Sequence, residues 1–138
     1  MKKTTILLLL VTISGLACIK NNNKPACSIQ VCTNLFASIT IHFTDNQGQA
    51  IAVSNFQAIN LRTGMQTGSS AATSNLMPGY YIVADDTDLK NLSTDGDNIQ
   101  VTATNPTNNQ TKTVTVKVGG GCACHISKIS GPDQVIFN

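Results

Sequence analysis

The chain has 138 residues, which is the length of one domain, and a formal net charge of +2 with 4% aromatic residues. Lys2 and Lys3 account for the whole of that charge, so the rest of the chain is neutral and has no cluster of Lys or Arg. This balance, with few aromatic side chains on which bases could stack, excludes nucleic acid as an expected partner.

Residues 1–18 have the layout of a bacterial lipoprotein signal. Lys2 and Lys3 precede an apolar run at residues 6–11 that is too short to span a bilayer as a helix, and the chain then reaches Cys18. We expect removal of the signal peptide, residues 1–17. Cys18 then becomes a lipid-modified N-terminus on the periplasmic side or the cell surface of a bacterial envelope. The alternative is an ordinary secretory signal cleaved before Pro25.

A polar, proline-broken tether at residues 18–26 separates the anchor from the domain, residues 27–138. Within the domain, apolar residues recur with period two at residues 39–43, 99–103 and 114–118, which predicts strands with one buried face. Turn formers, among them Pro106, lie between the last two of these strands and predict that they form a hairpin.

Further strands are predicted at residues 51–53, 56–61, 65–67, 80–84 and 135–137, and a single helical turn at residues 88–93. The phase of alternation slips near Ser54 and Asn55, which indicates a β-bulge or a change of sheet. About seven short strands without an amphipathic helix predict an all-β fold, a single β-sandwich of immunoglobulin-like or transthyretin-like type.

Four cysteines follow the lipidation site, two near the start of the domain and two near its end: Cys27, Cys32, Cys122 and Cys124. In an exported protein an even number predicts two disulfides. The last two would share one face of a strand, where a bond between them is strained, so we expect each to pair with one of the first two. Such bonds would clamp the first strand to the segment after glycines 119–121. A bond between the first two is the alternative, and the connectivity stays open.

A metal site is the other interpretation of these cysteines. Four thiolates and the imidazole of His125 exceed what tetrahedral zinc requires, although the spacing is not that of a zinc knuckle or ribbon. A nucleophilic pair of Cys124 and His125 is disfavoured, because adjacent residues of a strand point to opposite faces. Disulfides are the main expectation, and redox chemistry is a third interpretation.

Five of the seven carboxylates follow the predicted strand 80–84 closely: Asp85, Asp86, Asp88, Asp95 and Asp97. Calcium binds to oxygen-rich loops, but this spacing matches no EF-hand loop and the composition is that of turns. We therefore expect a solvated loop, with a calcium site as the alternative.

Two segments combine a strand with a turn. Residues 39–51 read Ile-Thr-Ile-His-Phe-Thr-Asp-Asn-Gln-Gly-Gln-Ala-Ile, and residues 76–83 read Leu-Met-Pro-Gly-Tyr-Tyr-Ile-Val. They resemble the Asp-x-x-Gly turn and the Leu-x-Pro-Gly-x-Tyr strand entry of carboxypeptidase-regulatory-like domains. Ala50 stands where that family usually has Pro, and a second Asp-x-x-Gly-x-Phe motif is missing from the sequence. The resemblance implies a small bacterial lipoprotein that carries an immunoglobulin-like or transthyretin-like β-sandwich.

The sequence holds no nucleophile elbow, P-loop, dinucleotide-binding fingerprint or HExxH pair. We therefore expect no enzyme and no cofactor, but a binding or structural module whose loops bind a protein or a glycan. The competing hypothesis is a thiol- or zinc-dependent periplasmic protein that uses the four domain cysteines and His125. Exposure of both Tyr80 and Tyr81 would favour a carbohydrate or protein platform, whereas His42 is expected to face solvent without a ligand.

Overall fold

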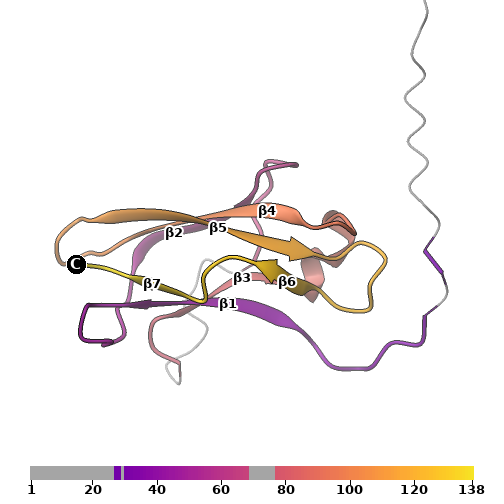
Figure 1. Ribbon diagram of the computed structural model, residues 1–138, viewed down its shortest axis with the longest axis horizontal. Coiled ribbons are helices and arrows are strands. Elements are labelled where there is room, and N and C mark those ends of the chain that lie inside the picture. The colour runs from indigo at the N-terminus through magenta and orange to yellow at the C-terminus, as the bar shows by residue number, and fades with distance from the viewer. Residues whose placement is uncertain (1–26, 29, 69–76) are drawn as a thin grey trace, which may run out of the picture.

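The computed structural model describes residues 27–28, 30–68 and 77–138, and this part of the chain is nearly all β-structure (Figure 1). The predicted signal peptide, tether and Cys18 lie outside the described residues. The elements in chain order are β1 (Ser38–Thr44), β2 (Ser54–Asn60), β3 (Tyr80–Asp85), the 3-10 helix η1 (Asp86–Asn91), β4 (Asp97–Thr104), β5 (Thr111–Gly119), β6 (Ser127–Ser130) and β7 (Gln134–Ile136).

Two sheets face each other and form the all-β sandwich that the sequence predicts (Figure 1). One sheet has the strand order β3-β1-β7 and the other has the order β2-β4-β5-β6. β7 runs parallel to β1, and the other strand pairs are antiparallel. The last strand therefore lies beside the first, which brings the two ends of the domain into one sheet.

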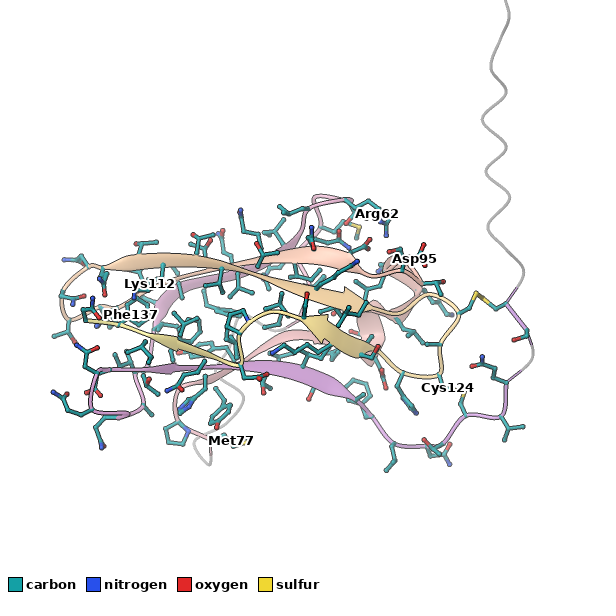
Figure 2. The ribbon with its side chains drawn as sticks, in the orientation of Figure 1. Arg62, Met77, Asp95, Lys112, Cys124 and Phe137 are labelled. Atoms are coloured by element: carbon teal, nitrogen blue, oxygen red, sulfur yellow. A yellow bond between two sulfur atoms is a disulfide. The ribbon has the colours of Figure 1, made fainter. Side chains whose placement is uncertain are left out.

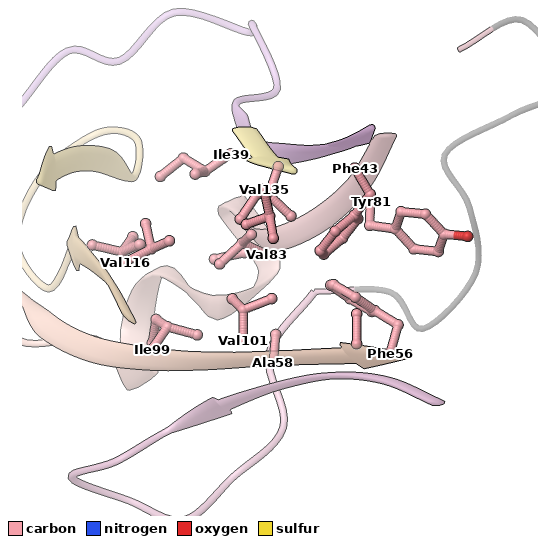
Figure 3. Packing of buried hydrophobic residues seen from close by; sticks show 14 of the residues in the cluster. Ile39, Phe43, Phe56, Ala58, Tyr81, Val83, Ile99, Val101, Val116 and Val135 are labelled. Carbon is pink, nitrogen blue, oxygen red and sulfur yellow. The ribbon is translucent and has the colours of Figure 1, made fainter. Parts of the chain in front are cut away.

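The core lies between the sheets because every second side chain of the central strands points inward. Ile41 and Phe43 of β1 and Ile99 and Val101 of β4 are buried in this way. Figure 3 shows Phe43, Ile99 and Val101 among the core side chains. The burial of these alternating positions is the reason that the period-two pattern in the sequence located the strands correctly.

Aromatic rings pack together in the same core. The ring of Phe43 lies 5.5 Å from that of Tyr81 and 6.2 Å from that of Phe56, in edge-to-face arrangements (Figure 3). The Tyr81 hydroxyl, at the polar end of its ring, donates to the carbonyl oxygen of Val53 at 3.1 Å and accepts from the Val53 N–H at 2.9 Å. Tyr81 can therefore be buried without an unsatisfied hydroxyl.

The predicted hairpin is confirmed: β4 and β5 pair without interruption as far as Thr104 and Thr111. Its turn is closed by the N–H of Asn105, which donates to the carbonyl oxygen of Gln110 at 2.8 Å. The slip predicted in β2 is confirmed as well, because the register with β4 shifts there and Asn55 has a φ of 51°.

Two predicted strands are wrong. Residues 51–53 form no strand, because the N–H of Val53 donates to the hydroxyl of Tyr81 rather than to a neighbouring strand. Residues 65–67 make only an isolated bridge, through Gln66, to the edge strand β2. Both segments have backbone hydrogen bonds to a neighbouring strand, from Ile51 to Phe43 and between residues 65–67 and β2, but these do not extend into a ladder.

The sequence does not predict β6, because it holds a single large apolar residue, which is half exposed at the sheet edge. η1 begins two residues before the helical turn predicted at residues 88–93. Asp85 caps this helix: its carboxylate accepts from the N–H of Thr87 at 2.8 Å, and the carboxylate of Asp88 accepts from the N–H of Asp85 at 3.1 Å. This capping box is what starts the helix at this point.

Candidate functional site at the disulfide end

Two disulfides tie the N-terminal segment of the domain to the connection between β5 and β6. They join Cys27 to Cys122 and Cys32 to Cys124, with Cα–Cα distances of 5.0 and 5.3 Å (Figure 2). The prediction that each C-terminal cysteine pairs with an N-terminal one is confirmed. The segment that they hold comprises residues 27–28 and 30–37 and is called the strap.

The local geometry differs from the prediction. Residues 121–125 form turns rather than a strand, because the N–H groups of Gly120 and Gly121 donate to carbonyl oxygens of Ser93 and Leu89 at 3.1 and 2.8 Å. The cysteines therefore do not share a strand face, although their pairing was predicted correctly. The bonds hold the strap, which precedes β1, and do not clamp β1 itself.

The structure gives no support to the zinc-dependent alternative. All four cysteines of the domain are bonded in pairs, so none is left as a thiolate ligand. His125 is bonded to Asp86 and Thr33 instead. Among the described residues, no three His, Cys, Asp or Glu side chains are grouped to hold a metal ion.

His125 connects the strap to η1. Its Nδ1 lies 2.7 Å from Oδ2 of Asp86, and its Nε2 lies 2.9 Å from the hydroxyl oxygen of Thr33. The Asp86 carboxylate also accepts from the N–H of Ala37 at 2.8 Å and from the N–H of Ile126 at 2.9 Å. Because this carboxylate is ionised, Nδ1 donates to it, and Nε2 forms the second hydrogen bond with the Thr33 hydroxyl. These contacts are called the His125 latch.

A hydroxyl, an imidazole and a carboxylate in this order also form the triad of many acyl-transfer enzymes. Such chemistry further requires backbone N–H groups aimed at a reacting oxyanion. The N–H groups of Ala37 and Ile126 donate to the Asp86 carboxylate instead. What the contacts of these three side chains show is that they fasten the strap to η1.

The Asp86 carboxylate makes the stability of the domain depend on pH. Its pKa falls from 3.8 to about 2, chiefly because the N–H of Ala37 donates to it and further because His125 and the N–H of Ile126 do so. A pKa lowered in the folded state means that the ionised group stabilises the fold above about pH 4 and that this stabilisation is lost as the pH falls from about 4 to 2.

We expect the free energy of unfolding, measured by urea titration, to fall over this pH interval and to fall less steeply in Asp86→Asn. Asp133→Asn removes a highly exposed carboxylate and serves as the control, with the slope of the wild type. If all three proteins lose stability in parallel between pH 4 and pH 2, Asp86 does not hold the strap in the way described.

Three of the remaining clustered carboxylates, those of Asp85, Asp88 and Asp97, form hydrogen bonds within the fold. Asp85 caps η1, and Asp88 also accepts from the N–H of Gly68 at 3.1 Å. Asp97 is buried and bonded to protein donors, whereas Asp95 is exposed. Among the described residues, no three of these carboxylates are grouped to hold a metal ion, and the calcium site stays an untested alternative.

Arg62 and Asp97 form an ion pair that the sequence did not reveal. Nε and Nη2 of Arg62 donate to the two carboxylate oxygens of Asp97 at 2.7 Å each, and Nη2 also donates to the carbonyl oxygen of Asn91 at 2.7 Å. The only available signal was that Arg62 is the sole arginine of the chain and stands beside a Thr-Gly turn. The pair joins the turn after β2 to the end of η1 and the start of β4.

A cleft of about 1020 Å³ opens beside the Cys27–Cys122 disulfide. Arg62 and Lys90 line it together with Asp95, so both signs of charge are present. The Arg62 guanidinium is already bonded to Asp97, so this cleft has no convergent charge that selects an anion or a cation.

The tyrosine platform considered from the sequence is reduced to one ring. Tyr81 is only 4% exposed and belongs to the core, whereas the ring of Tyr80 stacks on His42 with their centroids 4.1 Å apart. His42, expected to face solvent, is partly covered by this stacking. Half of the argument for an aromatic binding platform is therefore removed.

No helix in the described part of the chain has both the length and the apolar character needed to cross a membrane. The disulfides indicate an oxidising compartment outside the cytoplasm. Comparisons with protein-family models, with curated proteins and with solved structures gave no match to this chain. The resemblance to carboxypeptidase-regulatory-like domains therefore stays a prediction. The two-sheet β-sandwich is established by the strand pairing in the structure.

Proposed function

We propose that this chain is a lipid-anchored module of a bacterial cell envelope and that it binds or supports a partner without catalysis. The observation that carries the proposal is the pair of disulfides that fastens the strap. Cys27 comes nine positions after Cys18, the expected lipidation site. A chain anchored at Cys18 would enter the sandwich at the end that carries the two disulfides. A force applied to the tether would therefore be transmitted through the disulfides to the β5–β6 connection before it reached β1.

The end of the sandwich opposite the strap would then meet the partner. The β1–β2 and β4–β5 connections and the C-terminus lie at this far end (Figure 1). Its exposed side chains are mostly amides and hydroxyls, among them Asn46, Gln47, Thr107 and Asn109. Uncharged hydrogen-bonding groups on loops of a rigid scaffold suit a protein or a glycan partner.

The anchor is tested by Cys18→Ala expressed in the bacterial host. We expect the wild-type protein to lack residues 1–17, to carry a lipid adduct in its intact mass and to partition almost wholly with membranes. The variant should lose the adduct and leave the membrane fraction. In both proteins the domain cysteines should alkylate only after reduction.

Lys20→Ala, two positions further along, is the control and should keep the lipid. A wild-type protein without a lipid adduct, cut before Pro25 and found in the soluble fraction, would refute the anchor and support an ordinary secretory signal.

A further inference from the structure

The strap exposes its apolar side chains. Val31, Leu35 and Phe36 are 101%, 76% and 66% exposed, more than any other large apolar residue that the structure describes. Apolar side chains gathered on a short surface segment usually mark a contact with another surface. A membrane, a protein partner or a second copy would each cover them.

The strap is held so that these side chains stay outward. Cys27 and Cys32 fix it to the β5–β6 connection, and the His125 latch fixes it at Thr33 and Ala37. Figure 2 shows the strap looping out beyond the end of the sheets, near Cys124. Both ends of the strap are thus fastened while Val31, Leu35 and Phe36 stay exposed.

The charge of the N-terminal sequence favours a membrane, although in space the Asp86 carboxylate lies beside the end of the strap at Ala37 and Asp95 lines the cleft beside Cys27. The first acidic residue of the chain is Asp45, so residues 18–44 hold no carboxylate and carry Lys20 and Lys24. An anionic lipid surface attracts lysines and repels carboxylates. The nine positions between Cys18 and Cys27 span at most about 30 Å when fully extended, so a bilayer that holds the lipid is within reach of the strap.

We propose that the strap is a second membrane contact, in which Val31, Leu35 and Phe36 enter the interface of an anionic phospholipid bilayer. This inference rests on the proposed lipid anchor, which would hold the strap at a high effective concentration beside the bilayer. The contact fixes the orientation of the sandwich and points the β4–β5 turn away from the membrane.

The test uses tryptophan fluorescence, since the chain has no tryptophan of its own. Phe36→Trp reports from the strap, and Ile136→Trp reports from an exposed site on β7 as the matched control. The mature acylated proteins are placed in vesicles of phosphatidylethanolamine and phosphatidylglycerol, with or without brominated acyl chains. We expect a blue-shifted emission and about threefold quenching by brominated lipid for Phe36→Trp, and neither change for Ile136→Trp.

Adding Val31→Ser and Leu35→Ser to the Phe36→Trp protein should remove most of this quenching. Both side chains are fully or largely exposed, so the fold should survive and the urea midpoint should stay unchanged. Unchanged quenching in this triple variant would overturn the role given to the two side chains.

Several outcomes would overturn the proposal as a whole. Unquenched Phe36→Trp in a protein whose mass includes the lipid refutes the strap contact and leaves the anchor standing. Equal quenching of both reporters means that the whole domain lies on the bilayer. A blue shift that grows with protein concentration without vesicles assigns the strap to a second copy.

If the mass shows no lipid, the anchor fails independently of the strap. The same protein is then added to preformed vesicles. Quenching of Phe36→Trp in that mixture keeps the strap as a membrane contact in its own right, and no quenching overturns it.

Discussion

The variant that lacks both disulfides, with serine at all four cysteines of the domain, is expected to lose about 7 kcal/mol of unfolding free energy. The Cys27–Cys122 bond joins residues 95 positions apart, and closing a loop of that length removes denatured-state chain entropy equivalent to about 4.5 kcal/mol. Once it is closed, the Cys32–Cys124 bond closes a ring of only about nine residues, which contributes about 2.5 kcal/mol more. Single domains have a total stability of about 5 to 15 kcal/mol, so we expect a largely unfolded protein at 37 °C.

Removing one disulfide should cost less than half of this loss. With either bond left in place the long loop stays closed, so each two-serine variant should lose only about 2 to 3 kcal/mol. Urea titrations of the wild type and the three variants measure these values, with circular dichroism as the signal. The difference between the double loss and the summed single losses is then a coupling of about 2 kcal/mol.

Additive losses would contradict this account. They would mean that each disulfide stabilises the folded state through separate local contacts of the strap, rather than through a shared constraint on the unfolded chain. Cys18→Ala, outside the domain, is the control and should leave the urea midpoint unchanged.

The sandwich could be predicted from the sequence where strands bury one face. In β4 the residues Ile99, Val101 and Ala103 are buried and the residues between them are partly or fully exposed. Apolar residues therefore alternate with polar ones along the sequence with a period of two, which predicts a strand. Two disulfides between the ends of the domain could also be predicted, from the number of cysteines and from export. Their connectivity could not, because both pairings close loops of similar length.

The latch could not be predicted because its partners are far apart in sequence. His125 and Asp86 are separated by 39 positions, and Thr33 and His125 by 92. Each of the five clustered carboxylates has the same turn-like surroundings, so nothing local distinguishes Asp86 from Asp95. The strand assumed at Cys124 gave no indication of the partners of His125, since the chain turns there.

The second large effect is expected at Asp97, whose side chain is 3% exposed. Its carboxylate accepts from Nε and Nη2 of Arg62, from Nδ2 of Asn60 at 2.8 Å, and from the hydroxyl and N–H of Ser93 at 2.8 and 3.2 Å. Asp97→Ala would leave the buried amide of Asn60 and both donors of Ser93 without their acceptor. We expect a loss of about 3 kcal/mol in urea titrations, because each unsatisfied buried donor costs about 1 kcal/mol or more.

Arg62→Ala is the matched variant and should cost only about 1 kcal/mol, because the Arg62 side chain is 52% exposed and solvent screens its charge.

The hydrogen bonds from Arg62, and then those from Asn60 and Ser93, hold the pKa of Asp97 well below its usual range. A lowered pKa in the folded state means that this stabilisation is present above about pH 4 and is lost as the pH falls below it. The stability gap between wild type and Asp97→Ala should therefore narrow on acidification from pH 5 to pH 2. A gap that stays constant, or equal losses in Arg62→Ala and Asp97→Ala at neutral pH, would show that the ionised Asp97 is not the centre that joins β2, η1 and β4.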